Sequence, residues 1–292
     1  MPRWVHLLAV TGGVLFAGIA QAQTYSCSAA RPPNYTQTYS SVSNASTLLN
    51  VTVTCRRRGN GPALSINYTL TPDNGLYAIG AQNRAERAGQ YINYDLYAGS
   101  CIAPWSGAGT ITLPGAGRNA SISQTLTYYG CVPASQPVLP AAGNYTDTVG
   151  MTLAVTNPVV TITGANPQTF NATIRVNAAC AFSTFPGSVN FGTYTAFQGS
   201  ANTANTSFAT SCTNLTPYTL SLDATGGVVS GLNYSLLLNT TASGGTHPFG
   251  PVSGTGVPQT FYINGTMPAN QAGTCSTGTC AGSQAHTLTV SY

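Results

Sequence analysis

The chain contains eight cysteines, and their number and spacing favour disulfide chemistry. Each half carries four of them: Cys27, Cys55, Cys101 and Cys131, then Cys180, Cys212, Cys275 and Cys280. An even count that is shared equally between two halves is typical of disulfides in an exported protein. The similar spacing at the start of each set pairs Cys27 with Cys55 and Cys180 with Cys212. The remaining residues then pair as Cys101 with Cys131 and Cys275 with Cys280.

Metal binding is the alternative use of these cysteines. Only His247 and His286 could assist them beyond residue 22, and no Cys-x-x-Cys spacing occurs. We therefore expect no metal site and no cofactor.

Catalytic side chains are scarce. The acids are Asp73, Glu86, Asp95, Asp147 and Asp223. A serine nucleophile needs a positioned base, but His247 is followed by Pro248 and has no acidic neighbour in the sequence. We expect no catalytic residue, and the sequence does not indicate an enzyme.

The first 22 residues have the pattern of a secretory signal peptide. Arg3 and His6 precede an apolar stretch from Leu7 to Ile19, and Ala20-Gln21-Ala22 forms a small-x-small cleavage site. We expect an exported protein that begins near Gln23.

Composition predicts an all-β protein. Alternation of apolar and polar residues is common, as in Leu64–Leu70, and turn residues separate such segments. Charged residues make up only 5% of the chain, and the nine basic residues are all Arg. Because a basic face is lacking, nucleic acid is not an expected partner.

The sequence repeats itself, which predicts two related domains. The phrase Gly-x-x-Pro-Ala-x-Gln occurs at Gly130–Gln136 and again at Gly265–Gln271. Two further matches align Ile92–Tyr97 with Leu232–Leu237 and Asp147–Leu153 with the segment that starts at His286. Short strands with one early disulfide per copy fit two immunoglobulin-like β-sandwiches, which we place at residues 23–164 and 165–292.

Four features of the second copy carry a family resemblance: Phe191-Gly192-Thr193-Tyr194, Asn233–Leu236, the Gly-x-x-Pro-Ala-x-Gln phrase and a Thr/Val strand that leads to Tyr292. Together they resemble the spore coat protein U domain, which is found in pilus subunits of the archaic chaperone/usher pathway. The first copy resembles it more loosely, with Pro33-Asn34-Tyr35 in place of the Phe-Gly-x-Tyr element. Two copies behind one signal peptide resemble the tip adhesin of such a pilus.

This resemblance implies partners and a location. The partners are a periplasmic chaperone, an outer-membrane usher and the next pilus subunit, and the protein passes through the periplasm to a pilus tip at the cell surface. It also implies that the first domain binds and that the second is a pilin.

The two copies differ after their last shared strand, and we expect the second copy to be one strand short. The first is followed by the β-branched run Val159–Thr163, whereas the second stops at Tyr292. We expect Leu288, Val290 and Tyr292 to lie in the last native strand, beside a groove that accepts a donor strand. We expect Val159–Thr163 to complete the first domain in cis; the alternative makes it a linker or the first strand of the second domain. With only Gln23–Ser26 before Cys27, the chain is poorly equipped to donate a strand of its own.

Three segments of the first copy place apolar residues among turn residues, which predicts exposed loops that form an interaction site. The resemblance to tip adhesins implies that such loops bind an abiotic, water-repelling surface; a glycan is the other candidate. The residues are Leu76, Tyr77, Ile79, Ile102, Trp105, Leu113, Val138 and Leu139. The alternative is that they cover the ends of the sandwich. Arg56, Arg57 and Arg58 provide a second candidate, a basic patch for an anionic surface. The expected function is that of a pilus tip adhesin that mediates surface attachment and biofilm formation through these apolar loops. Two other functions stay open: a carbohydrate-binding adhesin, or a purely structural spore-coat or shaft subunit.

Overall fold

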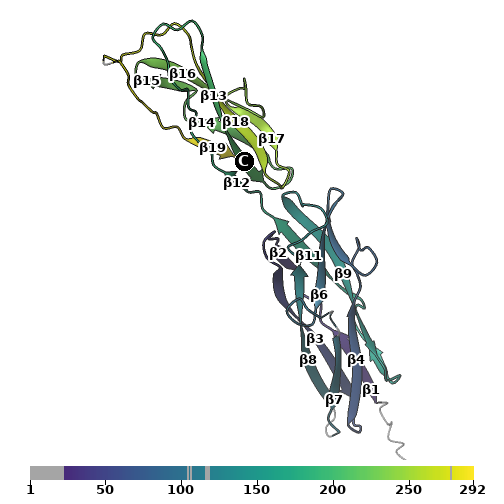
Figure 1. Cartoon of the computed structure of the whole chain (residues 1–292). Helices are drawn as coiled ribbons and strands as arrows, with labels where there is room; N and C mark the ends of the chain where they lie inside the picture. The colour runs from purple at the N-terminus through teal and green to yellow at the C-terminus, as the bar shows by residue number, and fades with distance from the viewer. Residues whose placement is uncertain (1–22, 104, 106, 116–118, 277) are drawn as a thin grey trace, which may run out of the picture.

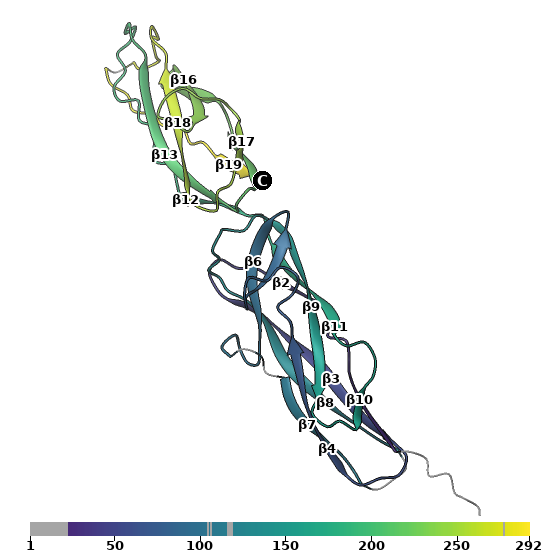
Figure 2. The same ribbon diagram turned by 90° about the vertical axis from the view of Figure 1, so that its right-hand side faces the viewer.

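The computed structural model describes residues 23–292 except 104, 106, 116–118 and 277. The described chain is all β and forms two domains that lie end to end, with most strands running along the long axis of the molecule (Figures 1 and 2). The predicted signal peptide lies outside the described residues. Within the described ranges no helix is long and apolar enough to cross a membrane.

The first domain contains eleven strands. They are β1 (Thr24–Ala29), β2 (Tyr35–Thr38), β3 (Ala45–Arg58), β4 (Leu64–Pro72), β5 (Asn83–Arg87), β6 (Gln90–Tyr97), β7 (Gly107–Leu113), β8 (Asn119–Val132), β9 (Gly143–Val155), β10 (Val160–Ile162) and β11 (Gln168–Val176). They form one hydrogen-bonded sheet in the order β10-β1-β3-β8-β6-β5-β9-β11-β2, and β4 joins both β7 and β9. The sheet folds over a single core, because alternate residues of its strands are buried, as in Ile66, Tyr68 and Leu70 of β4.

The second domain contains eight strands in two sheets. They are β12 (Cys180–Thr184), β13 (Asn202–Cys212), β14 (Pro217–Leu222), β15 (Gly226–Val229), β16 (Leu232–Asn239), β17 (Phe249–Ser253), β18 (Gln259–Met267) and β19 (Leu288–Ser291). One sheet has the order β12-β13-β18-β16-β15 and the other β17-β14-β19. Phe208, Tyr218 and Phe261 are among the aromatic residues at its core.

The strand pairings of the first domain recur in the second. The pairs β1–β3, β3–β8, β8–β6, β6–β5, β4–β7 and β4–β9 correspond to β12–β13, β13–β18, β18–β16, β16–β15, β14–β17 and β14–β19. The repeat in the sequence is therefore a repeat of an immunoglobulin-like sandwich. Among the described strands, β2, β10 and β11 of the first domain have no counterpart in the second.

The four disulfides join the cysteines that the spacing paired. Cys27–Cys55 links directly opposite residues of β1 and β3. Cys180–Cys212 does the same for β12 and β13. Cys101–Cys131 ties a loop to the end of β8, and Cys275–Cys280 closes a short loop before β19. The first pair of each domain thus marks equivalent positions of the repeat.

By its contacts, the first domain extends beyond the predicted boundary between residues 164 and 165. β11 pairs with β9 and β2 of the first domain, and its Phe170 and Ile174 are fully buried in that core. The segment Val159–Thr163 also belongs to the first domain, where Val160–Ile162 pairs with the outer edge of β1. It does not lie beside the last shared strand β9, however; β11 takes that position.

Candidate functional site

The repeated phrase makes the same hydrogen bonds in both domains. The side-chain oxygen of Gln136 accepts a bond from the backbone N–H of Asn93, and its amide nitrogen donates to the carbonyls of Asn93 and Pro133. In the second domain, Gln271 makes the matching bonds with Asn233 and Pro268. The glutamine joins the end of its own strand to the start of the neighbouring strand, which explains why the phrase ends in Gln.

The glycine of the phrase makes room for an aromatic ring. A Cβ atom on Gly130 would lie 2.6 Å from the Tyr35 ring, and one on Gly265 would lie 2.7 Å from the Phe191 ring. Phe191 therefore takes the place of Tyr35, in agreement with the substitution noted in the sequence. Tyr35 belongs to β2, whereas Phe191 lies in a segment without strand structure.

A buried tyrosine of each domain bonds to β9 or to the C-terminal segment that corresponds to it. The Tyr94 hydroxyl donates to Asp147, and the Tyr234 hydroxyl donates to Gln284. The Tyr234 hydroxyl also contacts His286, so the pairing of the strands decides the register. Tyr68-Thr69-Leu70 of β4 matches Tyr218-Thr219-Leu220 of β14, and Leu70 pairs with Leu153 as Leu220 pairs with Val290. Gln284 is therefore the counterpart of Asp147, and the sequence alignment of this strand was wrong by two residues. In the corrected register Met151 corresponds to Leu288, and Leu153 corresponds to Val290, because β4 and β14 pair with them in the same way.

In the first domain the edge beyond β9 is occupied. β11 runs antiparallel to β9 over residues 168–176 and parallel to β2. Its Phe170, Ala172 and Ile174 are fully buried. Met151, which pairs with Gln168 at the start of β11, is fully buried. Leu153 lies beyond β11 and is 1% exposed; its backbone bonds the side chain of Asn166.

In the second domain the equivalent edge is open. β19 pairs with β14, and no other described strand forms backbone hydrogen bonds with it, although β12 lies near it. Leu288 and Val290 are only partly buried, and Tyr292 is 62% exposed. Residues 281–287, which correspond to the first half of β9, have no strand structure. A row of backbone groups and a strip of core side chains thus lack the cover that β11 gives in the first domain.

A short chain of polar groups holds the segment just before β19. His286 lies between Asp223, at 2.7 Å from its Nδ1, and the Tyr234 hydroxyl, at 2.6 Å from its Nε2. The hydrogen bond with His286 lowers the pKa of the exposed Asp223 carboxyl. These contacts attach His286, two residues before β19, to Asp223 and to Tyr234 of β16.

Some of the predicted surface residues are not exposed. Leu113 is fully buried at the end of β7, so its assignment to a binding loop was wrong. It faces the core because the strand continues further than the glycines and prolines around it suggested. Trp105 is partly buried and its ring stacks on Tyr128 at a centroid distance of 4.9 Å, so it covers the core.

The loop with Val138 and Leu139 lies at the junction of the two domains. The Leu139 carbonyl accepts a hydrogen bond from Asn214 of the second domain, and a Cβ on Gly256 would lie 2.7 Å from the Leu139 side chain. Ala141 forms a parallel bridge with Asn214. Leu139 is therefore a contact between domains and does not face away from the second domain, as the binding prediction required.

Five large apolar side chains of the described first domain are more than 60% exposed. Val138, at 69%, lies in the loop at the domain junction, and the other four lie in loops near a small hollow. Val42 is 91% exposed, Ile102 83%, Leu76 70% and Ile79 63%. Their loops border one hollow of about 90 Å³, which is lined by Asn44, Gln82, Asp95, Tyr97, Cys101, Cys131, Val132 and Pro133. Burial raises the pKa of Asp95. Sequence reasoning found three of these four residues and missed Val42, whose neighbours are serines.

The Arg56-Arg57-Arg58 run is only in part a surface feature. Arg57 is 1% exposed and donates to the carbonyls of Gly61, Pro62 and Pro114. It therefore holds together two turns at the end of the first domain that lies away from the second (Figure 1). Arg57 therefore cannot contribute to a basic patch on the surface, which leaves Arg56 and Arg58.

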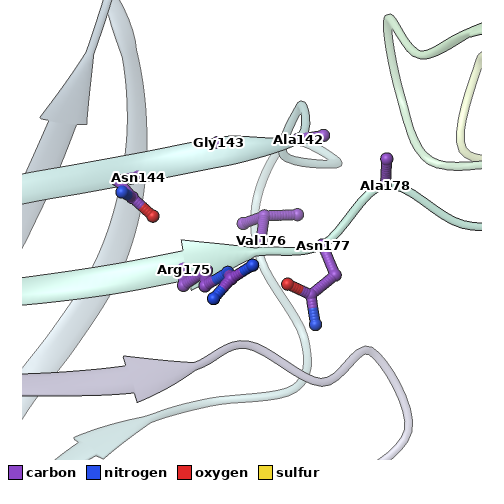
Figure 3. A pocket seen from close by; sticks show the side chains of 7 residues that line it. All are labelled: Ala142, Gly143, Asn144, Arg175, Val176, Asn177 and Ala178. Carbon is purple, nitrogen blue, oxygen red and sulfur yellow. The ribbon is translucent and has the colours of Figure 1, made fainter.

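A larger, open hollow of about 560 Å³ lies beside the connection between the domains (Figure 3). It is lined by Ala142, Gly143, Asn144, Arg175, Val176, Asn177 and Ala178. Arg175 is its single charged residue, and we assign it no ligand. Across the described ranges, no three His, Cys, Asp or Glu side chains come together as a metal site.

The family model described as Spore Coat Protein U domain matches the chain twice, at residues 15–152 and 166–280. The chain belongs to this family. Proteins of the family are structural, and the chain is not an enzyme. A search of curated proteins finds no match.

Several solved structures are similar in fold. The complex of the chaperone CsuC with the tip adhesion subunit CsuE from Csu pili of Acinetobacter baumannii matches at 16% identity over 93% of this chain and 100% of the other, with a TM-score of 0.47. The CupB6 tip adhesin from Pseudomonas aeruginosa matches at 10% identity over 92% and 96%, with a TM-score of 0.37. The CooA pilin subunit from enterotoxigenic Escherichia coli matches at 16% identity over 52% and 99%, with a TM-score of 0.29.

Proposed function

We propose that the chain is the adhesive end subunit of a pilus assembled by a chaperone/usher system. The second domain joins the fibre by accepting a strand from another subunit, after a periplasmic chaperone has held the same site and an outer-membrane usher has exchanged the two. The observation that carries the proposal is the contrast between two equivalent strands: β9 is flanked on both edges, and β19 on one. A chain with such an edge is stabilised by an extended partner.

The first domain supplies the contact with a surface, and this contact supports attachment and biofilm formation. Val42, Leu76, Ile79 and Ile102 are apolar, strongly exposed and carried by loops around one hollow. Exposed apolar clusters on a protein with few charges favour adsorption to water-repelling material. We assign the contact to these loops rather than to Leu113, Trp105 or Leu139.

A glycan is the second candidate ligand. Asn44, Gln82, Asp95 and Tyr97 bring amide, carboxyl and phenol groups to the hollow between those loops. Such groups on β-sandwich loops suit hydrogen bonding and stacking with a sugar. Inhibition of binding by a simple sugar would favour this function, and binding to polystyrene that no sugar affects would favour the apolar one.

Labelling of intact pili with an antibody against the first domain tests the position in the fibre. We expect one label at the end of each pilus. Label spread along the fibre would instead indicate a shaft or coat subunit. Loss of adhesion without loss of pili, after Val42 and Ile102 are changed to Ser, is the expected result for the contact itself.

A further inference from the structure

We propose that β11 is a donor strand: the second repeat inserts its own N-terminal segment into the first domain, so that the chain is a covalently joined pair of strand-accepting units. The ordinary alternative is that β11 is simply the last strand of the first domain. Three observations favour insertion.

The first observation is where the repeat begins. The second family match starts at residue 166, so β11 falls inside the second repeat, whereas the first match ends at residue 152. Both matches begin a similar distance before the first cysteine of their copy, Cys27 or Cys180. Only Asn177–Ala179 separate β11 from β12. By sequence, β11 is the leading segment of the second unit, although it folds in the first.

The second observation is which part of β9 depends on β11. The second half of β9, from Met151 to Val155, pairs with β4, as β19 pairs with β14. The first half, from Gly143 to Gly150, pairs with β11 and otherwise meets β5 at a single position, Thr146. The counterpart of this first half, residues 281–287, is strandless in the second domain. The strand is thus short where the inserted partner is missing.

The third observation concerns β2, the strand that pairs with the other edge of β11. β2, whose single strand partner is β11, lies over Gly130 through Tyr35. Phe191 lies over Gly265 in the same way, yet residues 191–194 have no strand structure. The two segments that flank β11, the first half of β9 and β2, therefore have counterparts in the second domain, residues 281–287 and 191–194. Neither counterpart has strand structure, and no described strand there corresponds to β11.

The side chains of β11 indicate which kind of segment the second domain would accept. β11 places Phe170, Ala172, Ile174 and Val176 inward at alternate positions, with polar or exposed residues between them. The second domain should take an extended segment of this type, antiparallel to residues 280–288, which correspond to residues 143–151, and parallel to residues 191–194. This last step rests on the proposed function of the second domain as a strand acceptor; the insertion of β11 into the first domain does not.

The insertion can be tested on the full mature chain with a protease site placed after Gly164, which is exposed and has no atom within 4 Å of an added Cβ. After cleavage we expect residues 23–164 and 165–292 to elute as one species at micromolar concentration. In mild urea, an excess of a synthetic peptide of residues 165–178 should release the second fragment. The same peptide with Phe170→Asp and Ile174→Asp should be about tenfold or more less effective, because it would bury two charges. Fragments that separate on cleavage, or equal release by both peptides, would overturn the insertion.

Contacts at the junction are the alternative cause of co-elution. The cleaved chain with Leu139→Ala and Asn214→Ala should still elute as one species. Separation of this variant would show that the junction, and not β11, holds the fragments together.

A second arm addresses the partner of β19. The labelled peptide of residues 165–178 should bind the uncleaved chain once, and Leu288→Asp should abolish that binding. Lack of binding to the uncleaved chain would overturn the assignment of β19 to this type of partner while leaving the insertion of β11 intact. Failure of the labelling experiment at the pilus end would affect neither result.

Discussion

Met151 and Leu288 occupy the same position in equivalent strands, yet Met151 is fully buried and Leu288 is only partly buried. We expect Met151→Ala to lower the free energy of unfolding of the first domain by about 2 to 5 kcal/mol, as for other large core residues. Leu288→Ala should cost clearly less in the free chain, because part of the side chain is already in contact with water. Urea unfolding of both variants measures this difference, and equal losses would contradict an open edge at β19.

The glutamine of the repeated phrase predicts a second pair of matched variants. Gln136→Ala removes one accepted and two donated hydrogen bonds, and Gln271→Ala removes two accepted and two donated ones. We expect a loss of about 1 to 3 kcal/mol in the corresponding domain, because backbone groups lose their partner. The loss should be larger for Gln136, whose surroundings are more buried. Ser135→Ala, at the exposed neighbouring position, is the control, and thermal unfolding is the measurement.

The paired glycines give a steric prediction. Gly130→Ala and Gly265→Ala place a methyl group within 2.7 Å of the rings of Tyr35 and Phe191. Displacement of these rings should destabilise each domain by about 1 to 3 kcal/mol. Gly99→Ala and Gly199→Ala are the controls, since a Cβ at either position meets no atom within 4 Å. If the controls lose as much stability as the test variants, the ring contact does not explain the glycines.

Adhesion should depend on the exposed apolar loops and not on fold stability. Val42→Ser combined with Ile102→Ser should lower retention of the purified mature chain on polystyrene severalfold, while the unfolding free energy stays within about 0.5 kcal/mol of the parent. Val228→Ser removes an equally apolar, 58% exposed side chain from the second domain and should leave retention unchanged. A loss of retention in this control would indicate unspecific adsorption.

The two domains should respond to acid in opposite directions. Burial raises the pKa of Asp95 and Asp147 in the first domain. The folded state therefore binds protons more readily than the unfolded state, so these groups favour folding below their unfolded pKa of about 3.9, and this contribution is lost as the pH rises through the folded pKa. Asp223 has a lowered pKa, because it bonds His286, and its contribution is present above about pH 3.9 and lost as the pH falls through the folded value.

Urea unfolding near pH 7 and near pH 4 checks the direction of each pH dependence. Hydrogen–deuterium exchange of peptides from each domain follows the two domains separately. Asp147→Asn should reduce the pH dependence of the first domain. Asp223→Asn should reduce that of the second. An unchanged pH profile in both variants would refute the assignment of these groups.

The sequence was sufficient for the features that recur locally. Alternating residues predicted the strands, the cysteine spacing predicted the four disulfides, and the phrase that ends in Gln136 and Gln271 predicted the repeat. Each depends on neighbours that are close in sequence or are duplicated in the second copy. The phrase is repeated because it makes the same hydrogen bonds in both domains.

Long-range pairing was beyond the sequence. Nothing near Phe170 or Ile174 shows that their strand lies in the preceding domain, and Val160–Ile162 is equally β-branched. The exposure of an apolar residue is equally hard to infer, because it depends on which strand or domain covers it. Leu113, Trp105 and Leu139 each lie close in sequence to glycines or prolines. Leu113 is nevertheless buried at a strand end, Trp105 stacks on Tyr128, and Leu139 contacts the second domain.

The antiparallel seam between β11 and β9 has a mechanical consequence. The strands run along the length of the molecule, and the second domain is attached at the end of β11 (Figure 2). In the proposed pilus subunit, tension on the fibre would pull β11 lengthwise past its neighbours, so all of its backbone bonds with β9 and β2 would be loaded together in shear and not opened one after another. Under this proposal, the seam carries the load between the attached first domain and the fibre.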